Sequence, residues 1–238
     1  MFKRVVLHEF KNILRDSMYF AFVFISLLMV VVGLFLVPYL RDLGNELAAN
    51  IVTIVFIMMN GFLYGAVVGF TLLDDQDDKV LFSLKITPIK VRYYVLIKLF
   101  LAYLFGFITT FLLIITTGFL EVSNFRDVLF ILILTPLQAP ILALLVNSFA
   151  NNKIEGFVVM KLSGIILIAP IAALFVSNWT ELLLGILPGF WSIRIATMQL
   201  LPTVFFINVT WIYFVIGIIV NSIFLWVLFK LYTRKVNI

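Results

Sequence analysis

The sequence predicts an all-α membrane protein with six transmembrane helices, and three observations lead to this fold class. Of its 238 residues, 64% are hydrophobic and only 12% are charged, whereas an ordinary soluble domain is about half apolar and a quarter charged. The hydrophobic residues gather in runs of about 20, the length with which a helix crosses a bilayer. The basic residues lie mainly in the segments that join these runs on one side.

The apolar runs belong to a single transmembrane domain that covers residues 1–238. The six spans are expected at residues 18–40, 50–73, 93–119, 128–149, 157–176 and 205–232. Backbone polar groups find no water inside a bilayer, so continuous apolar runs form helices. A β-barrel is disfavoured because its strands alternate apolar and polar residues, and these runs do not.

The basic residues orient the bundle. With the N-terminus inside, 14 of the 17 lysines and arginines fall in cytoplasmic segments, which is the bias of the positive-inside rule. We therefore expect a multi-pass protein of the plasma membrane with both termini in the cytoplasm. The net charge of +5 follows from this topology, and no nucleic-acid partner is expected.

Residues 1–17 have the pattern of an interfacial amphipathic helix. Phe2, Val6, Phe10 and Ile13 recur at helical spacing, and the basic residues fall mostly on the other face. Such a helix lies at the membrane surface, with its cations near anionic headgroups. The alternative is an ordinary flanking segment that carries positive-inside charge.

The inner segment after the second span is the most informative stretch of the chain. It opens with four acids, Asp74, Asp75, Asp77 and Asp78. A short amphipathic helix follows, and Thr87-Pro88 ends it, because a residue before proline is pushed out of the α region. Acids at the start of a short helix suit its positive dipole end. A solvated acidic cap or a docking surface is the interpretation, and no metal is expected, since an EF-hand needs a glycine and a terminal glutamate.

Two further segments connect the later spans. The inner turn after the fourth span carries Lys153 and Glu155, and is either a plain polar turn or a second cytoplasmic contact. The outer segment at 177–203 is apolar but broken by Pro188-Gly189 and Pro202. Each half is too short to cross the bilayer, so two short helices that dip into the outer leaflet are expected.

Polar and small residues stand out in the second span. Gly61, Gly65 and Gly69 recur every four residues beside Asn60. Such a stripe permits close helix packing, within the chain or between subunits. Intramembrane polar groups face a partner helix or a water-filled path. These four residues are therefore candidates for intrachain packing, for a dimer interface or for a substrate path.

The motifs of the common enzyme classes are absent. The sequence has no G-x-x-x-x-G-K-[ST] phosphate loop, no cysteine and a single histidine. We expect that the chain is not an enzyme, that it holds no cofactor or metal, and that any ATP would be hydrolysed on another protein.

The chain resembles, over nearly its whole length, the membrane subunit of an ABC-2 type ABC transporter, which has the type V exporter fold. The resemblance rests on the amphipathic N-terminus, the six spans, and the run from Leu81 to Pro88 with Tyr93-Tyr94 and Lys98 after it. It also rests on Lys153 to Gly156 and on the broken segment before the last span.

This resemblance implies that two permeases, identical or homologous, would pair in the membrane lipid above two ABC ATPase subunits, which bind ATP and Mg. A cytoplasmic coupling helix would dock on the ATPase, and short re-entrant helices would precede the last span. The coupling residues would be Asp74, Asp75, Asp77, Asp78, Lys79, Leu81, Phe82, Leu84, Thr87 and Pro88.

The expected function is export of a hydrophobic or amphipathic drug, peptide or lipid. Two alternatives remain open at this point. The chain could be a stand-alone secondary carrier or channel, although such carriers usually have a mid-membrane acid, and none is expected here. It could also be a non-transporting immunity or assembly protein of the membrane.

Overall fold

A computed structural model describes residues 11, 14–85, 90–172, 176, 178–202 and 205–236, with the side chains at 82, 85 and 165–170 left aside. All regular structure in this described part is helical, which confirms the all-α class. Most of the predicted interfacial helix and Thr87-Pro88 lie outside the described residues.

Six long helical segments correspond in order to the six predicted spans. Five segments are α2 (Ser17–Asp42), α3 (Glu46–Asp77), α5 (Val91–Thr116), α9 (Lys153–Ala172) and α12 (Thr210–Lys235). The sixth joins α7 (Phe125–Leu134), the 3₁₀ turn η1 (Thr135–Leu137) and α8 (Gln138–Phe149). The 3₁₀ turn contains Pro136, and proline interrupts an α-helix because it removes a helical hydrogen bond.

Short helices occupy the connections. They are α4 (Val80–Lys85), α6 (Phe119–Val122), α10 (Glu181–Leu184) and α11 (Phe190–Leu200). The outer segment therefore does contain two short helices, α10 and α11. Helix α12 begins at Thr210, five residues later than the predicted start of the last span.

Five helical segments of the described part are long and apolar enough to cross a membrane. They are α2, α3, α5, the α7–α8 segment and α12. Helix α9 has the position of the predicted fifth span, but the side chains at 165–170 in its centre are not described. The described part of the chain is thus a helical bundle with five candidate membrane spans.

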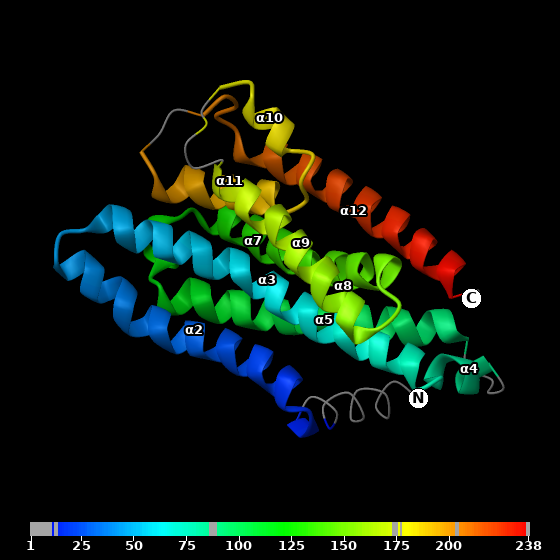
Figure 1. Cartoon of the computed structure of the whole chain (residues 1–238). Helices are drawn as coiled ribbons and strands as arrows, with labels where there is room; N and C mark the ends of the chain where they lie inside the picture. Colours follow the sequence, from blue (N-terminus) through cyan, green and yellow to red (C-terminus); the bar gives the residue numbers. More distant parts are fainter. Residues whose placement is uncertain are drawn as a thin grey trace.

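The start of α2, the start of α5 and the end of α12 gather at one end of the bundle (Figure 1). We call this the basic end, because α5 and α12 carry Lys90, Arg92, Lys230, Arg234 and Lys235 there. Helix α4 also lies at this end, whereas α10 lies near the opposite end.

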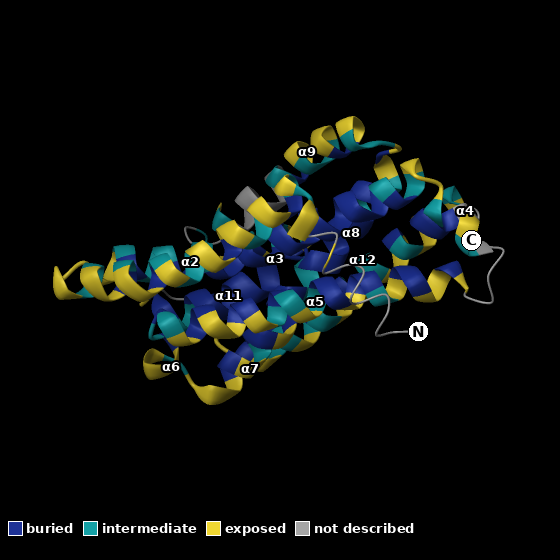
Figure 2. Cartoon of the chain, turned by 90° about the horizontal axis from the view of Figure 1, so that it is seen from below, coloured by how far each residue is buried: buried dark blue, intermediate teal, exposed yellow. Residues whose placement is uncertain are grey.

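Helix α3 is the centre of the bundle. It packs against α2, α5, α8 and α9, and its second half, from Gly61 to Leu73, is buried almost without interruption. Helices α2 and α12 are the least buried of the five candidate spans, and Figure 2 draws α2 mainly in the exposed and intermediate colours. A displacement of α3 would therefore affect most of the described molecule.

The glycine stripe of α3 packs within the chain. A Cβ at Gly61 would meet Gln138, one at Gly65 would lie 2.8 Å from the carbonyl oxygen of Ala139, and one at Gly69 would lie 3.4 Å from the Cα of Ala143. The three glycines thus let α8 lie directly on α3, as small residues do in membrane helices. Of the readings left open by the sequence, the structure favours intrachain packing, because α8 covers the stripe.

Asn60 is likewise used inside the chain. Its amide donates at 3.0 Å to the carbonyl of Gly106 and at 3.0 Å to the hydroxyl of Thr110. Its carbonyl accepts from Ser26 at 2.7 Å and from Thr109 at 2.8 Å. Asn60 therefore ties α3 to α2 and α5 through a buried hydrogen-bond network.

Candidate functional site

The candidate site is the basic end of the bundle, where α3 projects and α4 folds back. With a rise of about 1.5 Å per residue, α3 is about 48 Å long, well over the ~30 Å of bilayer hydrocarbon. Asp74, Asp75 and Asp77 belong to the last turns of this helix. The prediction that these acids open the short helix is therefore wrong. They lie at the negative end of the α3 dipole, which is unfavourable, so other groups must compensate them.

Asp75 is compensated from α5. Its carboxylate is 2.5 Å from the ammonium of Lys98 and accepts from the hydroxyl of Tyr94 at 3.0 Å. Lys98 also donates to the carbonyl of Thr71 at 3.4 Å and lies 5.2 Å from the centre of the Tyr94 ring. Asp75 and Lys98 are both buried. The sequence reading of a solvated acid thus fails for Asp75, which links α3 to α5.

Asp74 is compensated from α2 and α9. It accepts a hydrogen bond from the Tyr19 hydroxyl and lies 2.9 Å from the ammonium of Lys153. Lys153 is also 3.8 Å from Asp16 and 5.3 Å from the Tyr19 ring centre. Lys153 and Asp74 are about one third exposed, so solvent screens the ion pair and it adds little to stability. Its contribution is to position the two helices. It places the start of α9 against the end of α3.

The start of α9 is held by a cap similar to a capping box. Glu155 donates its backbone N–H to the side chain of Asn152 at 3.0 Å, and its carboxylate accepts from the backbone N–H of Asn151 at 2.8 Å. The Asn152 side chain thus satisfies one open donor of the helix start, and the Glu155 carboxylate ties the preceding residue to it. The backbone hydrogen bond from Asn151 lowers the pKa of the Glu155 carboxyl below its ordinary value. The predicted inner turn is therefore a rigid helix start.

Gly156 brings this helix start directly onto α3. A Cβ at Gly156 would lie 2.5 Å from Leu73 and 3.0 Å from Phe70. The rings of Phe70 and Phe157 are 4.6 Å apart at their centres. A force on the start of α9 would therefore reach the buried part of α3.

Helix α4 is anchored to the bundle by its apolar side. Leu81 is buried and packs in a cluster with residues of α3, α5 and α12, and Leu84 packs against the edge of this cluster. Asp77, Asp78 and Lys79 are exposed. The predicted docking residues are therefore split, because Leu81 holds α4 in place while the three charged residues face outward. The side chain of Phe82, with Thr87 and Pro88, lies outside the described residues.

A polar cleft of about 450 Å³ opens beside α4. Arg15, Asp16 and Tyr19 line it from the α2 side, and Asp74 and Asp78 line it from the other. Because acids outnumber the one arginine here, the cleft presents carboxylates toward anything that approaches this end of the bundle.

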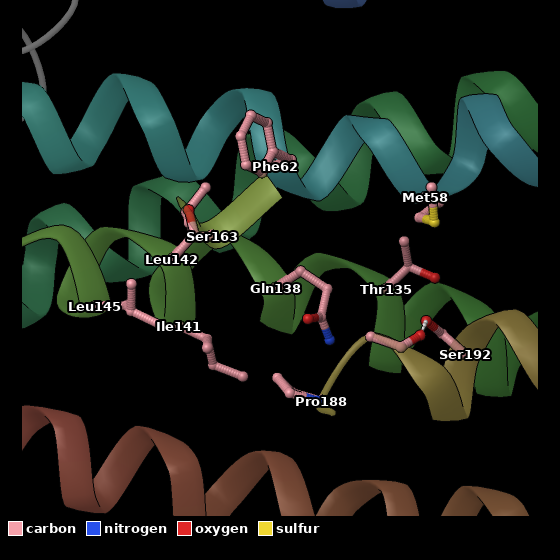
Figure 3. Close-up of a pocket in the computed structure, with 11 residues that line it drawn as sticks. Met58, Phe62, Thr135, Gln138, Ile141, Leu142, Leu145, Ser163, Pro188 and Ser192 are labelled. Atoms are coloured by element: carbon pink, nitrogen blue, oxygen red, sulfur yellow. Dashed lines mark hydrogen bonds between the residues drawn. The ribbon is translucent and has the colours of Figure 1, made fainter. Parts of the chain in front are cut away.

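A small pocket lies deeper in the bundle (Figure 3). Its walls are α3, the η1–α8 segment, α9 and the turn before α11, and Gln138 and Ser192 point toward it from two sides. The Gln138 amide donates to Asn221 at 3.0 Å. The pocket measures about 40 Å³, which holds a few waters but no drug-sized molecule, since such sites measure about 300 Å³ or more.

The opposite end contains a buried ionic cluster that sequence reasoning missed. Arg194 of α11 pairs with Glu181 of α10 and donates to the carbonyl of Val176 at 2.6 Å. Tyr213 of α12 donates to the other oxygen of Glu181. Both charged side chains are almost fully buried. The sequence did offer a signal for this pair. An acid and a base occur together in the otherwise apolar segment 177–203, and a charge buried in such a segment needs a partner of opposite sign.

The comparisons with known proteins point to transport. Residues 9–229 match the family model described as "Fluoroquinolones export permease protein Rv2686c-like". Two proteins of Mycobacterium tuberculosis are similar: the fluoroquinolones export permease protein MT2760 of strain CDC 1551 / Oshkosh and its counterpart Rv2686c of strain ATCC 25618 / H37Rv. Each is 26% identical over 199 residues, which cover 78% of this chain and 72% of the relative. No solved structure matches the chain.

Proposed function

The chain belongs to the Rv2686c-like family of fluoroquinolones export permeases, and on this premise we propose that it is the permease subunit of an ATP-driven exporter. This family agrees with the resemblance to ABC-2 type permeases that the sequence carries. A separate ATPase, present in two copies, would bind ATP and Mg and drive the movement of substrate out of the cytoplasm. Two permeases, identical or homologous, would form the path.

The proposal includes a topology. The basic end faces the cytoplasm, as the positive-inside rule requires, so the start of α2 and the end of α12 are cytoplasmic. Helix α9 is the fifth of six spans in the plasma membrane. Helices α10 and α11 enter the outer leaflet from outside and return, and the Glu181–Arg194 pair holds them together there.

The observation that carries the proposal is the attachment of α4 to the central helix. Leu81 fixes α4 on α3 and α5, and the Asp75–Lys98 pair locks α3 to α5 just behind it. A push on α4 would therefore move α3, and α3 contacts most of the other spans. An exporter without its own nucleotide site needs such an element. Nucleotide bound to another chain must shift the equilibrium between two conformations of the bundle, and α4 would transmit that shift.

The ATPase would grip the exposed acids. Asp77, Asp78 and Lys79 face outward at the α3–α4 turn, and the neighbouring cleft presents further carboxylates. A basic groove on the ATPase would complement this surface. Lys153 and Glu155 act indirectly, because they hold the start of α9 against α3 and do not form a separate contact.

The substrate we propose is an amphipathic aromatic drug of the fluoroquinolone type, the class in the names of the relatives. The pocket between α3, α8 and α9 is too small for such a molecule. Transport would therefore require α9 or α11 to move away from α3, which is the motion that ATPase closure would supply.

Charge reversal at the α3–α4 turn tests the docking surface. We expect Asp77→Lys with Asp78→Lys to abolish co-purification of the partner ATPase. The melting temperature of the permease should not change, because both carboxylates are exposed. Asp42→Lys, an exposed acid at the end of α2, is the matched control and should retain the ATPase. Unchanged binding by the double variant would contradict docking at this turn.

Reconstitution tests the function itself. Permease and ATPase in nanodiscs should hydrolyse ATP faster when a fluoroquinolone is added, and liposomes with both proteins should transport the drug only with ATP. Gradient-driven flux through the permease alone would favour a secondary carrier. ATPase turnover that is indifferent to the permease would favour an immunity or assembly protein.

A further inference from the structure

An apolar groove runs along the outside of the bundle between α5, α8 and α12. It measures about 370 Å³ and is open to the side, and its lining is almost wholly apolar. Leu96 and Phe100 come from α5, Pro140 and Leu144 from α8, and Trp226 and Phe229 from α12. This groove is separate from α4, from the polar cleft and from the interior pocket described above.

The groove lies in the half of the bundle next to the basic end. Leu96 and Tyr103 stand five and twelve residues after the start of α5, which is about 8 and 18 Å along the helix. At its deep end Tyr103 donates to the carbonyl of Ile133 at 3.4 Å. This depth corresponds to one leaflet, because a whole hydrocarbon core is about 30 Å thick.

The rim of the groove toward the basic end is cationic. Lys230 is exposed and follows Trp226 by one helical turn, with its ammonium 4.9 Å from the centre of the Trp226 ring. Arg234 follows by one more turn, and Arg92 precedes Leu96 by one turn on α5, so both lie on the faces that line the groove. Both arginines are exposed as well. An apolar channel thus ends in positive charge at the level of a tryptophan, the residue that favours the headgroup region.

We infer that this groove binds one phospholipid with an anionic headgroup from the leaflet at the basic end. An acyl chain fills the groove, and the phosphate lies beside Lys230 and Arg234. Charge complementarity selects this occupant. A second copy that docked here through its own α5 or α12 would bring more positive charge, because neither helix has an acidic residue in its terminal turn at this end. The lipid would brace α12 against α5 and α8.

Trp226 reports directly on the occupant, because it lines the groove and the residue is 64% exposed. The full-length chain is purified and mixed with brominated phosphatidylglycerol or brominated phosphatidylcholine, and tryptophan fluorescence is recorded. Trp226→Phe isolates the signal of this residue by difference. We expect phosphatidylglycerol to quench Trp226 at a lower mole fraction than phosphatidylcholine does.

Removal of the rim charge then tests the headgroup contact. Lys230→Gln should raise the half-quenching mole fraction of phosphatidylglycerol about fivefold, the factor expected for one lysine at an anionic surface, and Lys230→Arg should restore it. Phosphatidylcholine quenching should not change. Lys161→Gln removes an exposed lysine from α9, which packs against α3 and α8, and should have no effect.

Three results would overturn the inference. Equal quenching by the two lipids would mean ordinary boundary lipid, and an unchanged midpoint in Lys230→Gln would remove the headgroup contact. Absence of quenching by either lipid would mean that protein covers the groove. The test needs neither ATPase nor drug, so its outcome is independent of the proposed transport function.

Discussion

Buried charge at the basic end is concentrated in one pair, Asp75 and Lys98. The Lys98 side chain is fully buried, and the Asp75 side chain is 7% exposed. A pair of this kind contributes little net stability relative to apolar residues, but loss of one partner leaves an uncompensated charge. The contribution of the pair is therefore to fix the position of α3 relative to α5 at the point where α4 attaches.

We predict that Asp75→Asn destabilises the chain by about 3–5 kcal/mol. The measurement is the apparent melting temperature of the purified permease in detergent. Asp75→Asn combined with Lys98→Met should recover most of the loss, because no buried charge remains. Asp78→Asn, an exposed acid three residues away, serves as the control. A melting temperature of Asp75→Asn equal to that of Asp78→Asn would show that the pair does not stabilise the fold.

For single residues, the sequence predicts which side chains belong to the candidate site better than it predicts whether each is buried or exposed and which group it contacts. The four acids after the second span were identified, but Asp75 faces inward and Asp78 outward. That difference depends on where α3 ends, and hydropathy does not determine the last turn of a helix. The pairing of Glu181 with Arg194 was missed, because it depends on how α10 folds against α11.

Helix contacts at the centre of the bundle depend on glycine to different degrees. A Cβ at Gly65 would lie 2.8 Å from the backbone carbonyl of Ala139 and 2.8 Å from the Cβ of Leu142, whereas one at Gly69 has its nearest neighbour at 3.4 Å. Atoms of the backbone and of a Cβ cannot turn aside, so α3 and α8 would have to separate at Gly65. At Gly69 a methyl group fits.

Gly65→Ala should therefore destabilise the permease by about 1–3 kcal/mol, the usual effect of overpacking. Gly69→Ala should be neutral or stabilising by up to about 1 kcal/mol, because alanine has the higher helix propensity. Thermal unfolding of the two variants side by side gives the comparison. Equal melting temperatures would indicate that α8 does not rest on the stripe in the way the structure shows.

The cap of α9 should make stability depend on pH. The folded-state pKa of Glu155 is lowered by the backbone N–H of Asn151, so the cap stabilises the fold above the ordinary glutamate pKa. This contribution is lost as pH falls through the lowered folded-state value. Glu155→Ala should melt below wild type at pH 7, and the gap should close as pH falls through the lowered folded-state pKa of the Glu155 carboxyl. Asp42→Ala is the control, and a gap independent of pH would mean that the carboxylate does not act as a cap.

The elements themselves follow closely from the sequence, and their ends do not. Apolar runs of about 20 residues predict where a helix crosses, and the long helices lie where they were expected. Helix α3 nevertheless runs on to Asp77 and α12 begins only at Thr210. These ends depend on tertiary partners, since Lys98 and Lys153 neutralise the acids that extend α3.

The long helices differ in how much apolar surface they expose. Helix α3, whose glycine stripe was one candidate for a dimer interface, is largely buried within its own chain. Helix α2 instead exposes large apolar side chains along its length, with Phe24, Leu28 and Phe35 each more than 40% exposed. Contiguous apolar surface of this kind faces lipid or a partner in a membrane protein, and α2 is the face we propose for the second permease.

Disulfide cross-linking can decide between lipid and a second copy, because the chain has no native cysteine. Phe35→Cys on α2 should yield a covalent dimer when native membranes are treated with an oxidant, since two equivalent faces meet across a two-fold axis. Phe111→Cys on α5 is the matched control, because Phe111 is also exposed and apolar but lies on a helix for which no partner is proposed. Dimer bands of equal strength from both variants would indicate random collision. A dimer from neither, with transport intact, would point to a different second permease, because a heterodimer brings no second copy of the cysteine to the same interface.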